Sequence, residues 1–167
     1  MDDRYLEKVR FLVIDDNVFI RHLVRRVLAV LGATDIKEAG DGAEGLRVLN
    51  GFAPDIIILD WEMRPMDGLE FAKQMRQGLA GPSAFCPIIM LSAYSEKERV
   101  VTARDSGINE FVVKPFTANR LYGRIQQVIE KPRQFIKTEA YLGPDRRRRD
   151  VGASKGPDRR KPVKKEK

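Results

Sequence analysis

Acidic, hydroxyl and amino side chains follow four short apolar runs of this chain. Asp15 and Asp16 follow the first run, Asp60 the second, Ser92 the third and Lys114 the fourth. Carboxylates that are brought close together repel one another, and a hard divalent cation neutralises them through oxygen ligands. A carboxylate can also attack a phosphoryl group to form an acyl phosphate. The spacing therefore favours metal-assisted transfer of a phosphoryl group to an aspartate.

A divalent metal site is predicted around these acids. Mg²⁺ suits a site with few protein oxygens, several waters and a phosphate, and Mn²⁺ accepts similar ligands. We expect carboxylate ligands from Asp16 and Asp60, and from Asp15 either directly or through water. The backbone carbonyl of Glu62 is a further candidate ligand.

The phosphoryl group is expected on Asp60, because this residue ends the central apolar run DIIIL of residues 55–59. Catalysis of phosphoryl transfer consists mostly of positioning and charge neutralisation. The metal would hold one oxygen of the transferred group and Lys114 a second. The Ser92 hydroxyl and nearby backbone N–H groups would hold the third.

Each of these residues alone also has a purely structural explanation. The segment Asp15-Asp16-Asn17 is a good turn and helix cap, Ser92 could cap a helix, and Lys114 could be a solvated amine. Their common position at the ends of successive strands favours the functional interpretation, since unrelated structural roles would not place them at one edge.

The elements that position these residues alternate between short apolar runs and amphipathic segments with helical spacing. Strands are predicted at residues 9–14, 35–38, 55–59, 87–91 and 110–113, and helices at residues 18–31, 42–50, 68–77, 96–106 and 118–130. This alternation predicts an α/β fold with a flavodoxin-like, doubly wound, five-stranded parallel sheet, (βα)5. Ligands in such folds bind outside the carboxyl ends of the strands, which is where the acids are expected.

Composition divides the chain into a domain, residues 1–131, and a tail, residues 132–167. Residues 1–130 hold 17 basic and 19 acidic residues, a formal charge of −2, whereas residues 131–167 hold 14 and 5, a charge of +9. The net charge of +7 therefore describes the tail and not the domain.

One cysteine excludes an intrachain disulfide and a cysteine-based zinc cluster. Without an apolar leader or a run of ~20 apolar residues, a cytoplasmic location is expected.

Four stretches resemble the response-regulator receiver family: FLVIDDN, ILDWEMRPMDG, IIMLSAYS and FVVKPF. With the alternating strands and helices, the resemblance covers about residues 8–130. It implies that Asp60 is phosphorylated by a histidine kinase or phosphotransfer protein, with Mg²⁺ held by the acids. It also implies that Ser92 and Phe111 are switch residues, that Lys114 contacts the phosphate, and that a cis peptide precedes Pro115. On phosphorylation, the resemblance implies, the face made by the fourth helix, fifth strand and fifth helix changes shape.

The loop after Asp60 departs from the family pattern. The family usually has proline four residues after the phosphorylated aspartate, but here that position is Arg64 and proline comes one residue later. In the family, the positions of Glu62 and Tyr94 flank the path of the water that attacks the phosphate. We therefore expect Glu62 and Tyr94 to set the rate of dephosphorylation, and Arg64 to reach the phosphate.

The tail contains Gly143-Pro144-Asp145-Arg146-Arg147, and the same five residues recur 13 positions later. It has too few apolar residues to fold as an output domain, so we expect a largely disordered segment. An anionic partner such as nucleic acid, an acidic protein or a lipid surface is the alternative. Salt-dependent retention on DNA that is lost on tail deletion would identify a nucleic acid. The arginines that would bind such a partner are Arg146, Arg147, Arg148, Arg149, Arg159 and Arg160.

The sequence thus predicts a phosphorelay response regulator that signals by a conformational switch and has no enzyme activity beyond its own phosphate chemistry. The alternative is a regulator that binds an anionic partner through its Arg-rich tail. No membrane insertion is expected, because the sequence has no run of ~20 apolar residues. No sequence-specific DNA-binding domain is expected either, since we find no helix-turn-helix pattern.

Overall fold

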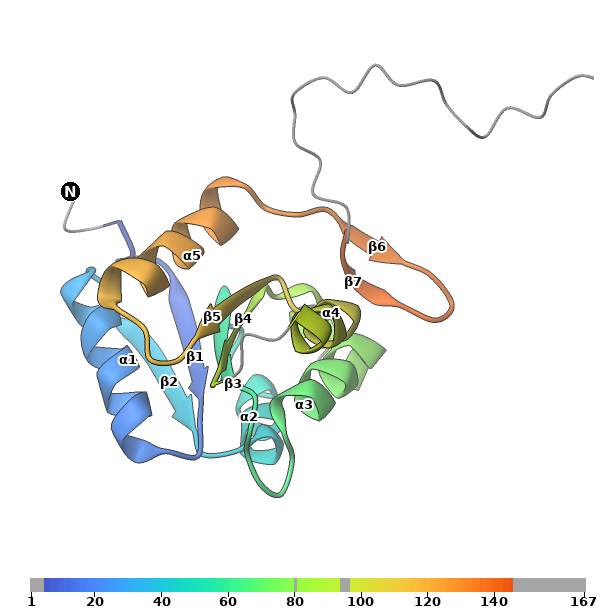
Figure 1. Ribbon diagram of the computed structural model, residues 1–167, viewed down its shortest axis with the longest axis horizontal. Helices are drawn as coiled ribbons and strands as arrows, with labels where there is room; N and C mark the ends of the chain where they lie inside the picture. Colours follow the sequence, from blue (N-terminus) through green and yellow to red (C-terminus); the bar gives the residue numbers. More distant parts are fainter. Residues whose placement is uncertain (1–4, 80, 94–96, 146–167) are drawn as a thin grey trace, which may run out of the picture.

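A parallel β-sheet forms the centre of the computed structural model, which describes residues 5–79, 81–93 and 97–145 (Figure 1). Its five strands lie in the order β2-β1-β3-β4-β5, and all neighbouring pairs are parallel. The strands are β1 (Arg10–Ile14), β2 (Asp35–Ala39), β3 (Ile56–Asp60), β4 (Ile88–Ser92) and β5 (Glu110–Val113). This is the order of a flavodoxin-like doubly wound sheet, which confirms the predicted fold class.

Helices cover both faces of the sheet, α1 and α5 on one face and α2, α3 and α4 on the other (Figure 1). Their bounds are α1 (Val18–Val30), α2 (Gly42–Leu49), α3 (Gly68–Gln74), α4 (Lys97–Asp105) and α5 (Ala118–Glu130). The largest difference from the predicted bounds is at α3, which ends three residues early because a different turn follows it. Among the described residues, no helix is long and apolar enough to cross a bilayer.

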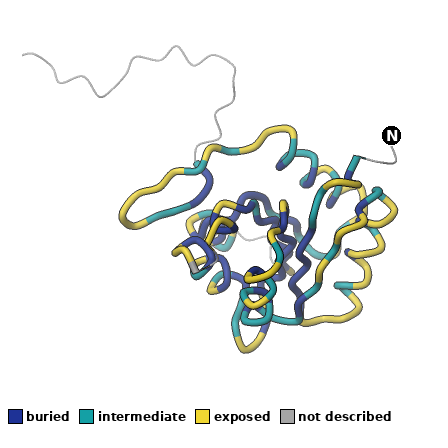
Figure 2. Tube along the Cα trace, turned by 180° about the vertical axis from the view of Figure 1, so that it is seen from behind, coloured by how far each residue is buried: buried dark blue, intermediate teal, exposed yellow. Residues whose placement is uncertain are grey.

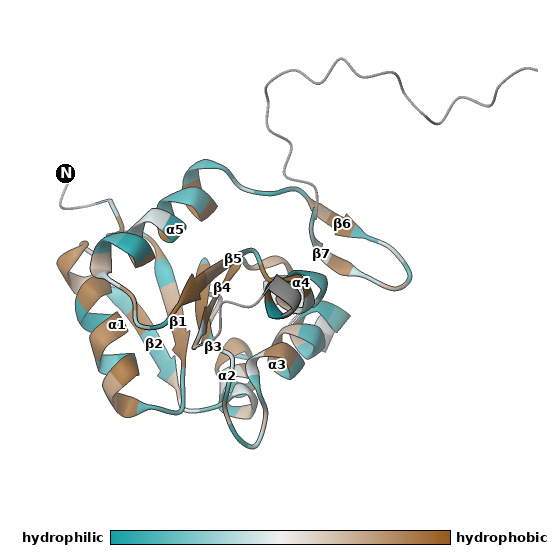
Figure 3. Cartoon of the chain, viewed as in Figure 1, coloured by the Kyte–Doolittle hydropathy of each residue, from teal (hydrophilic) through white to brown (hydrophobic). Residues whose placement is uncertain are grey.

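The two central strands β3 and β4 are buried along their whole length (Figure 2). Their side chains alternate between two hydrophobic clusters, one beneath each layer of helices, and hydrophobic residues dominate the middle of the sheet (Figure 3). Burial on both faces explains why these strands are continuous apolar runs in the sequence. It also leaves polar residues only at the strand ends, where a ligand can approach.

The connection between α3 and β4 forms two short helical turns. They are the π-helical turn η1 (Met75–Leu79) and the 3-10 turn η2 (Gly81–Phe85). Gly78 lies in the left-handed region, with φ +96°, which glycine adopts without strain. The sequence alone offers no reason for the length of this connection, but the buried Arg76 within η1 explains it.

Arg76 is 5% exposed, and carbonyl oxygens surround its guanidinium. It donates hydrogen bonds to the carbonyls of Ala84 at 2.6 Å, Cys86 at 2.7 Å and Gly107 at 2.8 Å, and to Asn109 Oδ1 at 3.2 Å. Burial lowers the pKa of Arg76 to about 10, because desolvation disfavours the charged form. The long connection therefore closes around this cation and joins it to the turn between α4 and β5.

A C-terminal β-hairpin covers the other side of Arg76. Its antiparallel strands are β6 (Phe135–Lys137) and β7 (Leu142–Pro144), drawn beside α4 in Figure 1. The ring of Phe135 lies 4.8 Å from the guanidinium carbon of Arg76. The Tyr141 hydroxyl donates to the Pro144 carbonyl at 2.9 Å and lies 3.4 Å from the Arg104 carbonyl near the end of α4. The hairpin is thus attached to the domain through both Arg76 and α4.

The structure differs here from the sequence prediction, which places residues 132–145 in the disordered tail. Each hairpin strand has three residues, too few to show a strand period in the sequence. Part of the first repeat copy closes the hairpin, since Asp145 N donates to the Gln134 carbonyl at 2.7 Å. A Cβ at Gly143 would lie 2.9 Å from the Gly107 Cα, so close packing requires glycine. The predicted tail arginines, Arg146–Arg149, Arg159 and Arg160, lie outside the described residues.

We predict that Phe135→Ala lowers the free energy of unfolding by about 1–2 kcal/mol, because it removes a ring stacked on a desolvated guanidinium. Ile136→Ala, at an exposed neighbouring position of the same strand, should change it by less than about 0.5 kcal/mol. Urea denaturation followed by circular dichroism measures both. Equal effects of the two substitutions would show that the hairpin does not pack on Arg76.

Candidate functional site

The carboxyl edge of the sheet brings together the residues predicted to do chemistry. Asp15 follows β1, Asp60 ends β3, Ser92 ends β4 and Lys114 follows β5. The strand register aligns these ends, since Lys114 N donates to the Ser92 carbonyl at 2.7 Å and Trp61 N donates to the Leu91 carbonyl at 3.0 Å. Asp60, at the end of the central strand, therefore has residues from both sides as neighbours.

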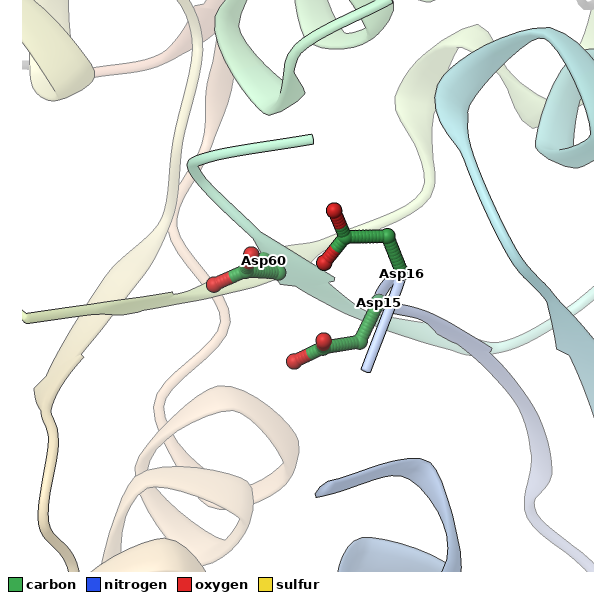
Figure 4. A group of neighbouring side chains, drawn as sticks. All are labelled: Asp15, Asp16 and Asp60. Atoms are coloured by element: carbon green, nitrogen blue, oxygen red, sulfur yellow. The ribbon is translucent and has the colours of Figure 1, made fainter. Parts of the chain in front are cut away.

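Three carboxylates gather at this edge (Figure 4). Asp15, Asp16 and Asp60 each offer one oxygen within 4.8 Å of the others. Asp15 is 1% exposed and Asp60 6% exposed, whereas Asp16 is open to solvent. Carboxylate oxygens in this number, with one side open to water, fit a hard divalent cation that keeps some of its waters.

Lys114 is the cation that the structure places between the acids. Its Nζ donates to Asp60 Oδ1 at 2.7 Å and to Asp15 Oδ2 at 3.0 Å. Burial raises the pKa of Asp60 to about 6, because the Lys114 hydrogen bond offsets only part of the desolvation and the Asp15 charge adds to it. Burial opposes the charge of Lys114, but Asp60 and then Asp15 raise the pKa of this amine. One lysine leaves the three carboxylates with an excess of negative charge.

Backbone contacts hold two of the acids in place. Asn17 caps α1 by accepting from Phe19 N at 2.9 Å, and Asn17 N donates to Asp15 Oδ1 at 2.8 Å. At β3, a Cβ on Gly68 would lie 2.2 Å from the Asp60 carbonyl oxygen, so the start of α3 can approach this strand only as glycine. The backbone therefore holds the Asp15 carboxylate directly, and the close approach of Gly68 holds the main chain of Asp60 in place.

The loop after Asp60 contains the predicted rate-setting residues. The peptide bonds Arg64–Pro65 and Lys114–Pro115 are both cis, the second as the family resemblance implies. The carboxylate of Glu62 is 56% exposed and pairs with Arg99 of α4 at 3.6 Å. Arg64 is exposed, and its reach to a phosphate stays a prediction. Tyr94 lies outside the described residues.

Trp61 connects the acid site to two other elements, a role that the sequence does not indicate. Its ring packs edge-on against Phe111 of β5, with centroids 6.2 Å apart and an interplanar angle of 90°. The Arg99 guanidinium carbon lies 5.5 Å from the Trp61 ring centroid. An arginine in a polar helix has no sequence signal that distinguishes it from a solvated one, so sequence reasoning missed Arg99.

Comparisons with known proteins agree with this geometry. The family model described as response regulator receiver domain matches residues 11–126. The chemotaxis protein CheY-3 of Vibrio cholerae is 30% identical over 125 residues, which cover 75% of this chain and 95% of that protein. The structure of CheY4 from Vibrio cholerae is similar with a TM-score of 0.66 and 32% identity, over 72% of this chain and 98% of that one. The receiver domain of the histidine kinase CKI1 from Arabidopsis thaliana, complexed with Mg²⁺, has a TM-score of 0.67 and 27% identity, over 76% and 96%.

The match to the family model begins within β1, includes the other four strands and the residues that gather at the carboxyl edge, and ends at residue 126, before the C-terminal hairpin. The chain belongs to the response regulator receiver domain family.

Proposed function

We propose that this chain is a phosphorylation switch that accepts a phosphoryl group on Asp60 from a histidine kinase or phosphotransfer protein. The observation that carries the proposal is the hydrogen bonding of Lys114 Nζ to both Asp60 and Asp15, two of the three clustered carboxylates. An amine that neutralises acids in this way is also placed to bind an oxygen of a phosphoryl group on Asp60. Receiver domains are generally signalling domains, and we propose no enzyme activity beyond the chain's own phosphorylation and dephosphorylation.

The proposed reaction is a substitution at phosphorus. A carboxylate oxygen of Asp60 forms a bond to phosphorus while the bond from phosphorus to the donor's imidazole nitrogen breaks, and that nitrogen keeps the electron pair. Lys114 would bind one oxygen of the transferred group, and the Ser92 hydroxyl at the end of β4 would donate to another.

A divalent cation suits the remaining charge. Mg²⁺, or Mn²⁺ in its place, would be held by Asp15, Asp16, Asp60 and the Glu62 backbone carbonyl. When bound, it supplies neutralisation of the negative charge on the carboxylates and the phosphoryl oxygens. The excess of carboxylates over the single Lys114 amine supports this assignment.

The proposed donor is a protein with an exposed helix, because α1 presents an apolar stripe next to the acids. Phe19 is 84% exposed, Leu23 47% and Val30 82%, at positions about one and three helical turns apart. Figure 3 shows the hydrophobic colouring along α1. A second helix could cover this stripe and bring its histidine to Asp60.

The proposed output face lies on α4, β5 and α5. A groove of about 500 Å³ lies there, and its lining includes the apolar Val100, Ile108 and Phe111 and the basic Arg120 and Arg124. Phe111 also contacts Trp61, next to the phosphoacceptor. A change in the position of Phe111 would therefore alter both the site and the groove. Binding of an anionic partner by the Arg-rich tail stays a prediction, because those arginines lie outside the described residues.

Trp61 fluorescence tests the proposed function. Trp61 directly follows Asp60 in the chain and contacts Phe111, so adding Mg²⁺ and then beryllofluoride, which imitates a phosphoryl group, should change its emission. Asp60→Asn removes the nucleophile and should abolish the response to beryllofluoride. A full response in the Asp60→Asn protein would contradict the assignment of Asp60.

The affinity for Mg²⁺ should fall as pH drops through about 6. The metal binds the ionised carboxylate, and Asp60 in the metal-free protein has a pKa of about 6. As the pH falls through the same range, the free energy of unfolding of the metal-free protein should rise. Asp60 takes up a proton at a higher pH in the folded state than in the unfolded chain, so protonation favours the folded state. Calorimetric titrations between about pH 5 and about pH 7.5 measure the metal affinity. An affinity that does not vary with pH would contradict Asp60 as a ligand.

Phe19→Asp should slow phosphoryl transfer from a phosphorylated histidine protein about tenfold or more, because it places a charge in the apolar stripe. Transfer from acetyl phosphate, which needs no docking surface, should be unchanged. Quench-flow measurement of both donors checks the prediction. An equal loss with both donors would place the defect in the acid site and not in donor docking.

A further inference from the structure

Arg99 contacts two residues of the phosphoacceptor loop at once. Its Nη1 lies 3.6 Å from Glu62 Oε1, and its guanidinium carbon lies 5.5 Å from the Trp61 ring centroid. Glu62 and Trp61 directly follow Asp60 in the chain, whereas Arg99 belongs to the first turn of α4. A single side chain thus joins this helix to the residues beside the phosphoacceptor.

The ion pair with Arg99 restrains the Glu62 carboxylate, because this side chain is too exposed for burial to fix its position. The Glu62 side chain is 56% exposed and that of Arg99 37% exposed, so both are in contact with water. The cation-π contact of the guanidinium with the buried Trp61 ring reduces the number of orientations from which Arg99 can reach Glu62. Glu62 is therefore held toward α4 by a partner that is itself held in place.

We infer that Arg99 is a positioning residue that lengthens the lifetime of the Asp60 phosphate by restraining Glu62. The inference rests on the proposed function of Asp60. In hydrolysis, a water oxygen bonds to phosphorus, the bond from phosphorus to Asp60 Oδ breaks, and the Asp60 carboxylate leaves with the electron pair. The water proton passes to a base, and the free Glu62 carboxylate, two residues from Asp60, would accept it or orient the water. The ion pair with Arg99 holds the Glu62 carboxylate away from the attacking water and offsets the negative charge of this carboxylate.

The same contacts connect the lifetime to the state of α4. Trp61 lies between Arg99 and Phe111, with its ring edge-on to Phe111 at 6.2 Å. A partner that shifts α4 or Phe111 would move Arg99 relative to Glu62. Binding at the output face would then change the rate of phosphate loss without touching Asp60.

A double-mutant cycle on phosphate lifetime tests the inference. The full chain is phosphorylated with acetyl phosphate, the donor is removed, and loss of the phosphoryl group is followed by intact-protein mass spectrometry. Arg99→Ala should shorten the lifetime about two- to fivefold, the range expected for loss of one exposed ion pair. The same substitution in a Glu62→Gln background should have a much smaller effect, and Arg99→Lys, which keeps the charge, should restore part of the lifetime.

Arg104→Ala is the matched control, because Arg104 lies near the other end of α4 and pairs with its neighbour Asp105. Its lifetime should equal that of the unmodified chain, and the Trp61 emission should change with Arg99→Ala only. If Arg99→Ala leaves the lifetime unchanged, or shortens it equally with and without Glu62, the inference is wrong. If the unmodified chain takes up no phosphate at all, the proposed function fails instead, so the two failures are distinct.

Discussion

Burial of acidic side chains that a single lysine only partly neutralises is the constraint on which the rest of this structure depends. Asp15 and Asp60 lie almost wholly out of solvent, and Lys114 contacts both of them. Burial raises the pKa of Asp60 to about 6, so the metal-free site holds its charge against an opposing free energy. A bound cation or a phosphoryl group on Asp60 changes the electrostatic free energy of this site more than it would at a solvated carboxylate, because the buried site is only partly neutralised.

The fold keeps this unfavourable arrangement through packing elsewhere. Two strands buried on both faces carry Asp60 and Ser92 to the same edge, and Gly68 lets α3 approach the Asp60 backbone. Helix α4 is attached near both of its ends. Arg99 joins its start to the loop after Asp60, and Tyr141 of the C-terminal hairpin contacts the Arg104 carbonyl near its end. The hairpin and the loop after Asp60 thus contact opposite ends of the same helix.

The sequence predicts two kinds of feature of this structure. They are the elements with a regular spacing of apolar residues and the polar residues that directly follow a strand. Apolar runs and helical spacing predict all five strands and helices, and the parallel topology then places Asp15, Asp60, Ser92 and Lys114 together. Contacts between side chains of distant segments have no such signal. Arg76 and Phe135 are separated by a long stretch of chain, as are Glu62 and Arg99, and nothing local marks either pair. The hairpin and the contacts of Arg99 therefore become visible only in three dimensions.

The most direct measurement of the central claim is the site of phosphorylation itself. The protein would be incubated with acetyl phosphate and Mg²⁺, and the phosphoryl group would be located by reduction of the acyl phosphate with borohydride and peptide mass spectrometry. The account predicts one modified residue, Asp60, with uptake that requires the metal and falls when Lys114 is replaced by alanine. Modification at another residue, or uptake that depends on neither the metal nor Lys114, would contradict it.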